Sequence, residues 1–85
     1  MIGFTYVISD IQGLHARNAL QLARAAEGYQ CRIRISKGEK QADGKQVLSL
    51  MALNACCGDT LEFQLSGEDE QEAAAYLQAL AKEIL

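Results

Sequence analysis

The chain has 85 residues, of which 49% are hydrophobic and 22% charged, a composition typical of one globular domain spanning residues 1–85. A folded chain of this length buries only roughly 60–65% of its unfolded surface, so we expect no deep pocket for a large cofactor and no bound cofactor. The formal net charge of −3 argues against nucleic acid as a partner, because a phosphate backbone requires a basic face.

The first residues alternate between two faces, which is the pattern of a half-buried strand. Ile2, Phe4, Tyr6 and Ile8 share the face that we expect to be buried. Residues 10–13, Asp-Ile-Gln-Gly, break this alternation and predict a loop.

The period changes to that of a helix over residues 16–27, a segment rich in Ala, Leu, Gln and Arg. Its predicted buried face consists of Ala19, Leu22, Ala23 and Ala26. Gly28 follows directly, and we expect it to end the helix as a C′ residue.

Two strands and a short helix are predicted in the middle of the chain. Alternation returns at residues 31–36, residues 37–40 are typical of a hairpin turn, and a short strand follows near Lys40–Asp43. Residues 46–53 then have helical spacing. On this interpretation Val47, Leu50 and Met51 share one side, and Leu48 and Leu53 lie off that face.

The last two elements are a strand over Thr60–Ser66 and a helix over residues 69–84. Leu61, Phe63 and Leu65 are the inward residues of the strand. Acidic residues 68–72 come at the start of the helix, where its dipole favours negative charge, so they are interpreted as a solvated helix start.

The predicted element order is therefore βαββαβα. Strands mixed with helices in one small domain favour an α+β fold with the helices packed on one face of a single sheet. The short connections favour a largely antiparallel sheet.

Three cysteines, Cys31, Cys56 and Cys57, are an odd number, and adjacent cysteines rarely close an unstrained disulfide. No secretory signal pattern opens the chain, and no apolar run has the length of a membrane span. We therefore expect a cytoplasmic protein with reduced thiols and no membrane insertion. The single histidine lies far from the cysteine pair in sequence, so no metal site is predicted.

His15, the only histidine, lies where the first loop meets the first helix. Imidazole titrates near neutral pH and offers a nucleophilic nitrogen. The first amides of a helix form an anion site, and the Arg17 guanidinium can donate paired hydrogen bonds to phosphate oxygens. The residues alone leave two interpretations open: an anion-binding histidine, or a capping or surface residue without further role.

Four segments carry a resemblance to a known family. Gly13–Arg17 (GLHAR) resembles the active-site motif of HPr, the phosphocarrier of the phosphoenolpyruvate-dependent sugar phosphotransferase system. Asp43–Met51, Cys57–Leu61 and Gly67–Ala73 resemble later segments of the same family, in order and at matching spacing. The family's fold is an open-faced β-sandwich, in which three helices cover a four-stranded antiparallel sheet.

The resemblance implies a phosphoryl carrier, which is not a stand-alone catalyst. His15 would accept a phosphoryl group through Nδ1 from phospho-enzyme I and donate it to enzyme IIA domains. The Arg17 side chain and the backbone amides of Ala16 and Arg17 would stabilise the phosphoryl oxygens. Val47, Leu48 and Met51 would line an apolar surface for these partners, and Arg24 would add positive charge to it. The alternative for Val47 and Met51 is a purely structural role in the core, and for Arg24 it is a solvated position on the helix.

Two residues depart from the family pattern. Asn18 stands where many members have proline, and it would either loosen the first helical turn or offer an extra donor to the phosphate. Gln46 stands where Gram-positive members have a regulatory serine, which indicates that control by phosphorylation at that site is absent.

These departures motivate an alternative function, a regulatory binding module that docks on a transcription factor or an enzyme without phosphoryl relay. A third hypothesis is an unrelated enzyme that uses His15 as a general base, for which Asp10 is the nearest orienting acid.

Overall fold

The computed structural model describes all residues, 1–85, and contains seven elements. The elements are β1 (Ile2–Val7), α1 (Ala16–Glu27), β2 (Arg32–Lys37), β3 (Lys40–Asp43), α2 (Val47–Met51), β4 (Thr60–Ser66) and α3 (Glu70–Ile84). This order confirms the predicted βαββαβα sequence of elements.

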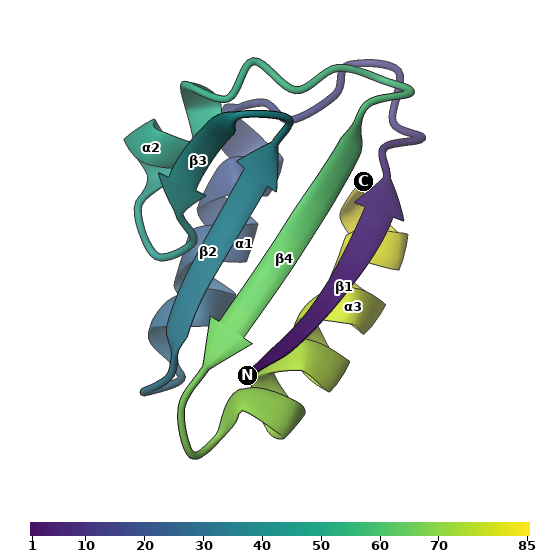
Figure 1. Ribbon diagram of the computed structural model, residues 1–85. Helices are drawn as coiled ribbons and strands as arrows, with labels where there is room; N and C mark the ends of the chain where they lie inside the picture. The colour runs from purple at the N-terminus through teal and green to yellow at the C-terminus, as the bar shows by residue number, and fades with distance from the viewer.

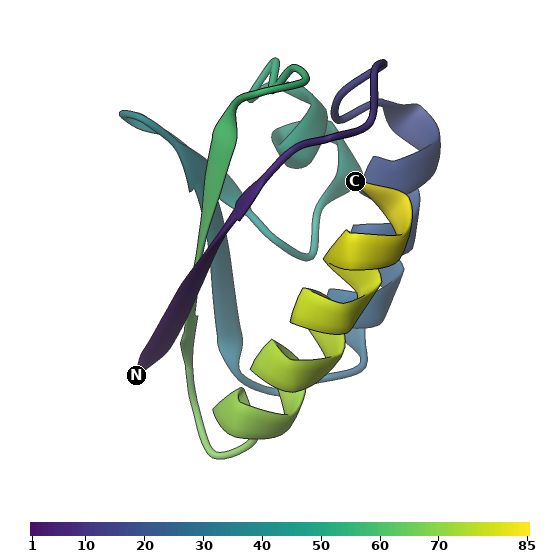
Figure 2. The ribbon, with the colours of Figure 1, turned by 90° about the vertical axis from the view of Figure 1, so that its right-hand side faces the viewer.

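The four strands form one antiparallel sheet in the order β1-β4-β2-β3 (Figure 1). β4 is central: it pairs with β1 from Ile2↔Leu65 to Val7↔Thr60, and with β2 on its other side. β3 is a short edge strand that pairs only with β2. Viewed along its edge, the sheet lies on one side of the molecule and the helices on the other, so one sheet face stays open (Figure 2). The predicted α+β fold and open-faced sandwich are confirmed.

The core fills the space between the sheet and the helices. It is supplied by the inward residues of the strands and by the apolar faces of α1 and α3, as the alternation and the helical spacing predicted. Phe63 on β4 is fully buried, and its ring stacks on Phe4 of β1 with the centroids 4.4 Å apart. Stacked rings of this kind add to the burial of apolar area in holding the two strands together.

The second helix differs from the prediction. α2 ends at Met51 instead of residue 53, and only Leu50 of its residues is fully buried. Leu53 was expected to lie off the buried face, but it is only 1% exposed. The chain leaves the helix before this residue, so helical spacing no longer decides where its side chain points.

Gly28 ends α1 as expected but not in the expected conformation. It is the C-cap itself, with φ −70° and ψ −8°, which is right-handed, whereas a C′ glycine is usually left-handed. Its amide donates to the carbonyl of Ala25 and the following amide of Tyr29 to that of Ala26, and these two bonds close the last turn.

The acidic residues before α3 are not simply solvated. The Asp69 carboxylate accepts hydrogen bonds from the amides of Gln30 and Cys31, at 2.8 and 2.9 Å, and these bonds lower its pKa. Glu70 pairs with the N-terminal ammonium at 2.9 Å and accepts from the Gly67 amide, which lowers its pKa as well. The start of α3 is therefore attached to the start of β2 and to the N-terminus.

Gly67 makes the close approach at this corner possible. It has φ +156°, and a Cβ atom there would lie 2.6 Å from the Cα atom of Cys31. Any side chain at this position would separate β4 from the segment leading into β2.

None of the helices combines the length and the hydropathy that crossing a membrane requires.

Candidate functional site

The loop before α1 is held against a second loop by a tight backbone contact. Gly13 has φ +70°, and a Cβ atom there would lie 2.5 Å from the carbonyl oxygen of Ala55. The amide of Leu14 donates to this same oxygen at 2.9 Å, and the Leu14 side chain is buried. The position of the next residue, His15, is thereby fixed relative to the rest of the fold.

His15 is the N-cap of α1 and is half-buried. Its backbone is extended, with φ −123° and ψ −179°, and its Nδ1 atom accepts a hydrogen bond from the amide of Arg17 at 3.3 Å. An Nδ1 atom that accepts carries a free electron pair, so the proton of the neutral ring is on Nε2. The ring therefore lies at the helix N-terminus with Nδ1 towards the first amides.

Asn18 completes a reciprocal cap. Its Oδ1 atom accepts from the amide of His15 at 2.8 Å, and its Nδ2 atom donates to the carbonyl of Gly13 at 2.9 Å. A weaker contact of 3.5 Å joins Nδ2 to the carbonyl of Ile84 at the end of α3.

Both sequence expectations for Asn18 are wrong. The side chain is buried, at 2% exposure, and its donors are directed into the protein, so it is not an extra donor to a phosphate. It also closes the first turn of α1 instead of loosening it, because an amide side chain here takes over the ordering that proline would supply through its fixed φ.

The surface around His15 is a shallow depression lined by Asp10, Gln12, His15, Arg17, Asn18, Gln21, Glu83 and Ile84. The Arg17 side chain is exposed and forms no ion pair. Asp10, the suggested orienting acid, accepts instead from the amide of Gln12 at 2.8 Å and makes no hydrogen bond to His15. No acid therefore orients the imidazole for general-base chemistry.

The first turn of α1 carries no acidic residue. The amide of Ala16 has no acceptor, and the amide of Arg17 has only the imidazole nitrogen. Unpaired amides at the positive end of a helix dipole attract an anion, so the vacant donors lie directly beside Nδ1.

The residues expected to dock partners lie on α1 and α2, which pack against each other (Figure 1). Leu48 is 81% exposed and Met51 37%, whereas Val47 is half-buried against the core. Arg24 is exposed on α1 two turns after Arg17. Of the apolar candidates, Leu48 is thus the most available for contact, and Val47 contributes more to packing.

Sequence reasoning missed Leu20 of α1, which is 40% exposed. The residue is apolar but falls outside the spacing of the buried face, and that mismatch was the signal that could have identified it. It adds an exposed apolar side chain on α1, the helix that packs against α2. We use the term apolar patch for Leu20, Leu48 and Met51.

Two nearby features complete the description. Gln46 is the exposed N-cap of α2 and makes no capping hydrogen bond with its side chain. Ser49 is half-buried, and its Oγ atom accepts from the amide of Asp43 at 3.1 Å, so it holds α2 to the end of β3.

The sequence and the structure of this chain are both similar to those of one protein family. The family model "PTS HPr component phosphorylation site" matches residues 2–83. The phosphocarrier protein HPr of Cupriavidus necator is 37% identical over 76 residues, which cover 89% of this chain and 84% of that protein. A structure of HPr from Thermoanaerobacter tengcongensis has a TM-score of 0.92 at 29% identity, covering 98% of this chain and 93% of that one. A histidine-containing phosphocarrier protein of Mycoplasma has a TM-score of 0.94 at 30% identity, covering 96% and 93%.

Proposed function

The chain belongs to the HPr family of phosphotransferase system components, and from this premise we propose that His15 accepts a phosphoryl group from phospho-enzyme I and donates it to enzyme IIA domains. HPr proteins are phosphocarriers and not catalysts, so the protein is a substrate of its partners in each transfer. The observation that carries the proposal is the Nδ1 atom of His15 at the N-terminus of α1, where the Arg17 amide donates to it by a long bond and the Ala16 amide has no acceptor.

The first transfer forms the bond from Nδ1 to phosphorus and breaks the bond from phosphorus to the donor group of enzyme I. The electron pair on Nδ1 attacks the phosphorus atom carried by enzyme I, the bond from phosphorus to the donor breaks, and the donor recovers its electron pair. The proton on Nε2 stays in place, so no general base is needed. The second transfer is the same step in the opposite sense, with the nucleophile of enzyme IIA as the acceptor.

The hydrogen bond from the Arg17 amide to Nδ1 is long, at 3.3 Å, and is easily given up. Once Nδ1 carries phosphorus, this amide and the amide of Ala16 can donate to the phosphoryl oxygens instead. The exposed Arg17 guanidinium adds paired, charge-assisted hydrogen bonds. These donors stabilise the phosphoryl group at the surface, where a partner can still reach it.

Partner docking is assigned to the surface beside His15. The apolar patch of Leu20, Leu48 and Met51 offers apolar area, and Arg17 and Arg24 offer positive charge without ion-pair partners. A partner surface with an apolar centre and acidic rim fits this arrangement, because complementary charge speeds encounter and orients the complex.

We place the protein in the cytoplasm, where thiols remain reduced. All three cysteines are free, and burial raises the pKa of the Cys31 thiol, which favours its protonated form.

The test is phosphorylation of the purified chain by enzyme I and phosphoenolpyruvate, followed by addition of an enzyme IIA domain. We expect an acid-labile, base-stable phosphate on wild-type protein, its loss on addition of enzyme IIA, and no phosphate on His15→Ala. Leu48→Ala is the matched docking control, and it should lower the transfer rate without abolishing the phosphohistidine.

The same variants separate a carrier from a binding module. If His15→Ala retains full function in the cell together with its partner affinity, the relay is wrong and docking alone is the function. A phosphate that is stable to acid, or that persists on His15→Ala, also contradicts the proposal.

A further inference from the structure

A second polar depression lies far from His15, where β3 leaves the sheet. The pairing of β2 with β3 ends at Arg34↔Asp43, and the chain then turns away through Gly44, whose amide donates to the carbonyl of Ile33 at 2.8 Å. The first half of β2 is left without a strand on that side, and a cavity of about 490 Å³ opens beside it. None of its lining residues belongs to the depression around His15.

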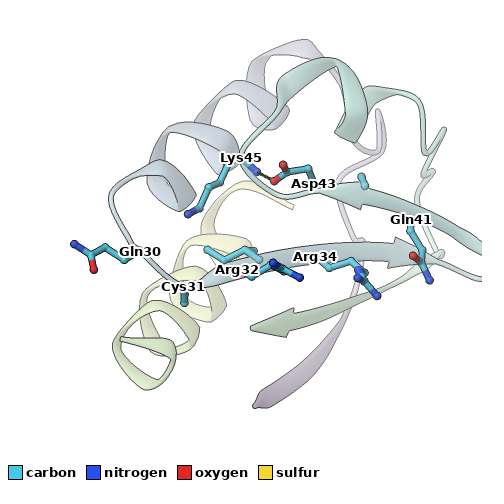
Figure 3. Close-up of a pocket in the computed structure, with 9 residues that line it drawn as sticks. Gln30, Cys31, Arg32, Arg34, Gln41, Asp43 and Lys45 are labelled. Carbon is cyan, nitrogen blue, oxygen red and sulfur yellow. Dashed lines mark hydrogen bonds between the residues drawn. The ribbon is translucent and has the colours of Figure 1, made fainter. Parts of the chain in front are cut away.

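Arg32 and Arg34 lie at the centre of this depression. They are two positions apart on β2, so their side chains share one face of the sheet, with their Cα atoms roughly 6.6 Å apart. Figure 3 shows both side chains projecting from the strand next to each other, with Gln41 towards one end and Gln30 towards the other. The same two arginines also line the adjacent hollow of about 440 Å³ over β4.

Neither arginine has an anionic partner. The ion pairs of the molecule are the N-terminus with Glu70 and Lys37 with Asp59. Asp43 is directly opposite Arg34 in the register, but one of its carboxylate oxygens accepts from the Lys45 amide, and it forms no ion pair. Glu62, the other acid on this face, accepts from the side chain of Gln64.

The two guanidinium groups repel each other because they carry like charges and lie side by side. They have no acidic partner although acids outnumber bases in this chain, whose net charge is −3. Lys45 adds a third positive charge at the rim, and its ammonium is held there by a 2.8 Å hydrogen bond to the carbonyl of Tyr29. The positive charge is thus concentrated in a concave surface, and an anion bound there would relieve the repulsion.

The rest of the lining is mixed: Cys31, Ile33 and Ala42 are apolar, Asp43 is acidic, and uncharged polar side chains border both hollows. Gln30 and Gln41 border the main depression, and Gln64 and Ser66 border the adjacent hollow. Amide and hydroxyl side chains both donate and accept, which suits the hydroxyl groups of a small polar molecule.

We propose that Arg32 and Arg34 bind the phosphate of a small phosphorylated metabolite with several hydroxyl groups, which contact the glutamines around the arginine pair. Arginine donates in a planar fork that matches phosphate oxygens, and a cavity of this volume is in the range of small-ligand sites. A nucleic acid fits less well, because a long polyanion requires a more extended basic surface than two arginines and one lysine.

The experiment is a titration of the ¹⁵N-labelled chain with glucose 6-phosphate at constant ionic strength, followed by amide chemical shifts. Inorganic phosphate and glucose serve as the partial ligands. We expect saturable chemical-shift changes at residues 30–34, 41–45 and 64–66 on addition of glucose 6-phosphate. Glucose 6-phosphate should bind more tightly than inorganic phosphate, and glucose should not bind.

Variants test the two arginines directly. Arg32→Gln and Arg34→Gln should each weaken binding roughly tenfold, because each removes a charge-assisted hydrogen bond. Arg34→Lys should retain part of the affinity, since the charge remains but the fork is lost. Arg24→Gln is the matched control, with the same change of charge on an exposed arginine of α1, and it should bind as wild type.

Three results would overturn the proposal: shifts confined to residues 13–18 at the start of α1, equal affinity in Arg32→Gln and wild type, or tighter binding of a phosphoserine peptide than of glucose 6-phosphate. The first assigns the anion to the His15 site, and the last assigns the surface to a protein partner. His15→Ala should bind glucose 6-phosphate normally, so the outcome is independent of the relay.

Discussion

The two long helices of the molecule begin in opposite electrostatic surroundings. α1 starts at the His15 imidazole and has no acidic residue in its first turn, so its leading amides are left for an external group. α3 starts at Asp69 and carries Glu70 and Glu72 in its first turn. Each helix has the same positive N-terminal dipole, and only the neighbouring side chains differ.

The difference shows that the positive N-terminal dipole of a helix can either stabilise the fold or remain available to an external anion. At α3 the chain's own carboxylates lie in the positive field, and two of them also accept backbone or N-terminal hydrogen bonds that connect distant segments. At α1 the field is not neutralised, and an exposed arginine strengthens it. A helix start without acids, next to a nucleophile, is therefore the feature that distinguishes the proposed transfer site from the structural helix start of α3.

The largest effect on the rate of phosphorylation is expected when a carboxylate is placed at the start of α1. Arg17→Glu gives α1 an acidic first turn like that of α3, and its charge repels the incoming phosphoryl group. We expect phosphorylation by enzyme I to slow on the order of a hundredfold, measured as the initial rate of phosphohistidine formation.

Arg17→Gln is the matched control for this variant, because it removes the guanidinium without adding an acid. Its rate should fall between those of wild type and Arg17→Glu. If all three proteins react at the same rate, the field at the start of α1 does not contribute to transfer.

The next effect is on the cap that holds His15. Asn18→Ala removes the acceptor for the His15 amide and the donor to Gly13, and both partners then lack hydrogen bonds at a partly buried site. We expect a loss of about 1–2 kcal/mol in the free energy of unfolding, measured by urea denaturation. Gln21→Ala, an exposed residue in the next turn, is the control and should leave stability nearly unchanged.

A smaller effect on stability is expected when the carboxylates at the start of α3 are protonated at low pH. The pKa values of Asp69 and Glu70 lie below their ordinary values of 3.8 and 4.5. Their stabilising contribution is therefore complete above these ordinary values and is lost as the pH falls through the lowered pKa values of the folded state. Wild-type melting temperature should fall in that acid range.

Asp69→Asn should reduce the melting temperature at pH 7 by less than Asn18→Ala does, and should make the acid decline shallower. Phosphorylation of His15 should be unaffected, since Asp69 holds only the start of β2. A change in the rate of phosphoryl transfer without a change in stability would contradict the assignment of a structural role to the start of α3 and a transfer role to the start of α1.

The smallest effect is expected for Glu72→Gln, also in the first turn of α3. Glu72 is exposed and makes no hydrogen bond or ion pair. Its charge forms no direct bond and acts on the helix dipole and on nearby Tyr29 only through space, so the melting temperature should change by less than about 3 °C in thermal denaturation. A drop as large as that of Asp69→Asn would show that the dipole, and not the hydrogen bonds to β2, dominates at α3.

Much of the fold followed from local patterns. Alternation correctly placed Leu61, Phe63 and Leu65 inside, and helical spacing did the same for Leu22. In β1 the predicted inward residues Ile2, Phe4 and Tyr6 are only half-buried against the core. The prediction of burial failed for a residue that lies beyond the end of a helix shorter than expected. Leu53 lies beyond the last turn of α2, and whether a residue is buried there depends on the path of the loop, which periodicity does not encode.

For the site, the sequence indicated which residues meet but not how each is held. His15, Ala16 and Arg17 are consecutive, so their proximity at a helix start followed from the chain itself. The inward direction of Asn18 did not, because its contacts reach Gly13 and the end of α3, which only the tertiary structure brings together. The unpaired state of Arg32 and Arg34 likewise depends on strands that pair across the sheet.

The carbonyl of Leu85, which accepts from the amides of Ser9 and Asp10 at 2.6 Å, has a consequence for how the protein is made. The loop leading to His15 is completed by a residue 76 positions later in the chain. During synthesis, the loop before His15 therefore cannot complete these hydrogen bonds until α3 and Leu85 have left the ribosome. Contacts of such long range also slow folding, because the chain must close a long loop before they form.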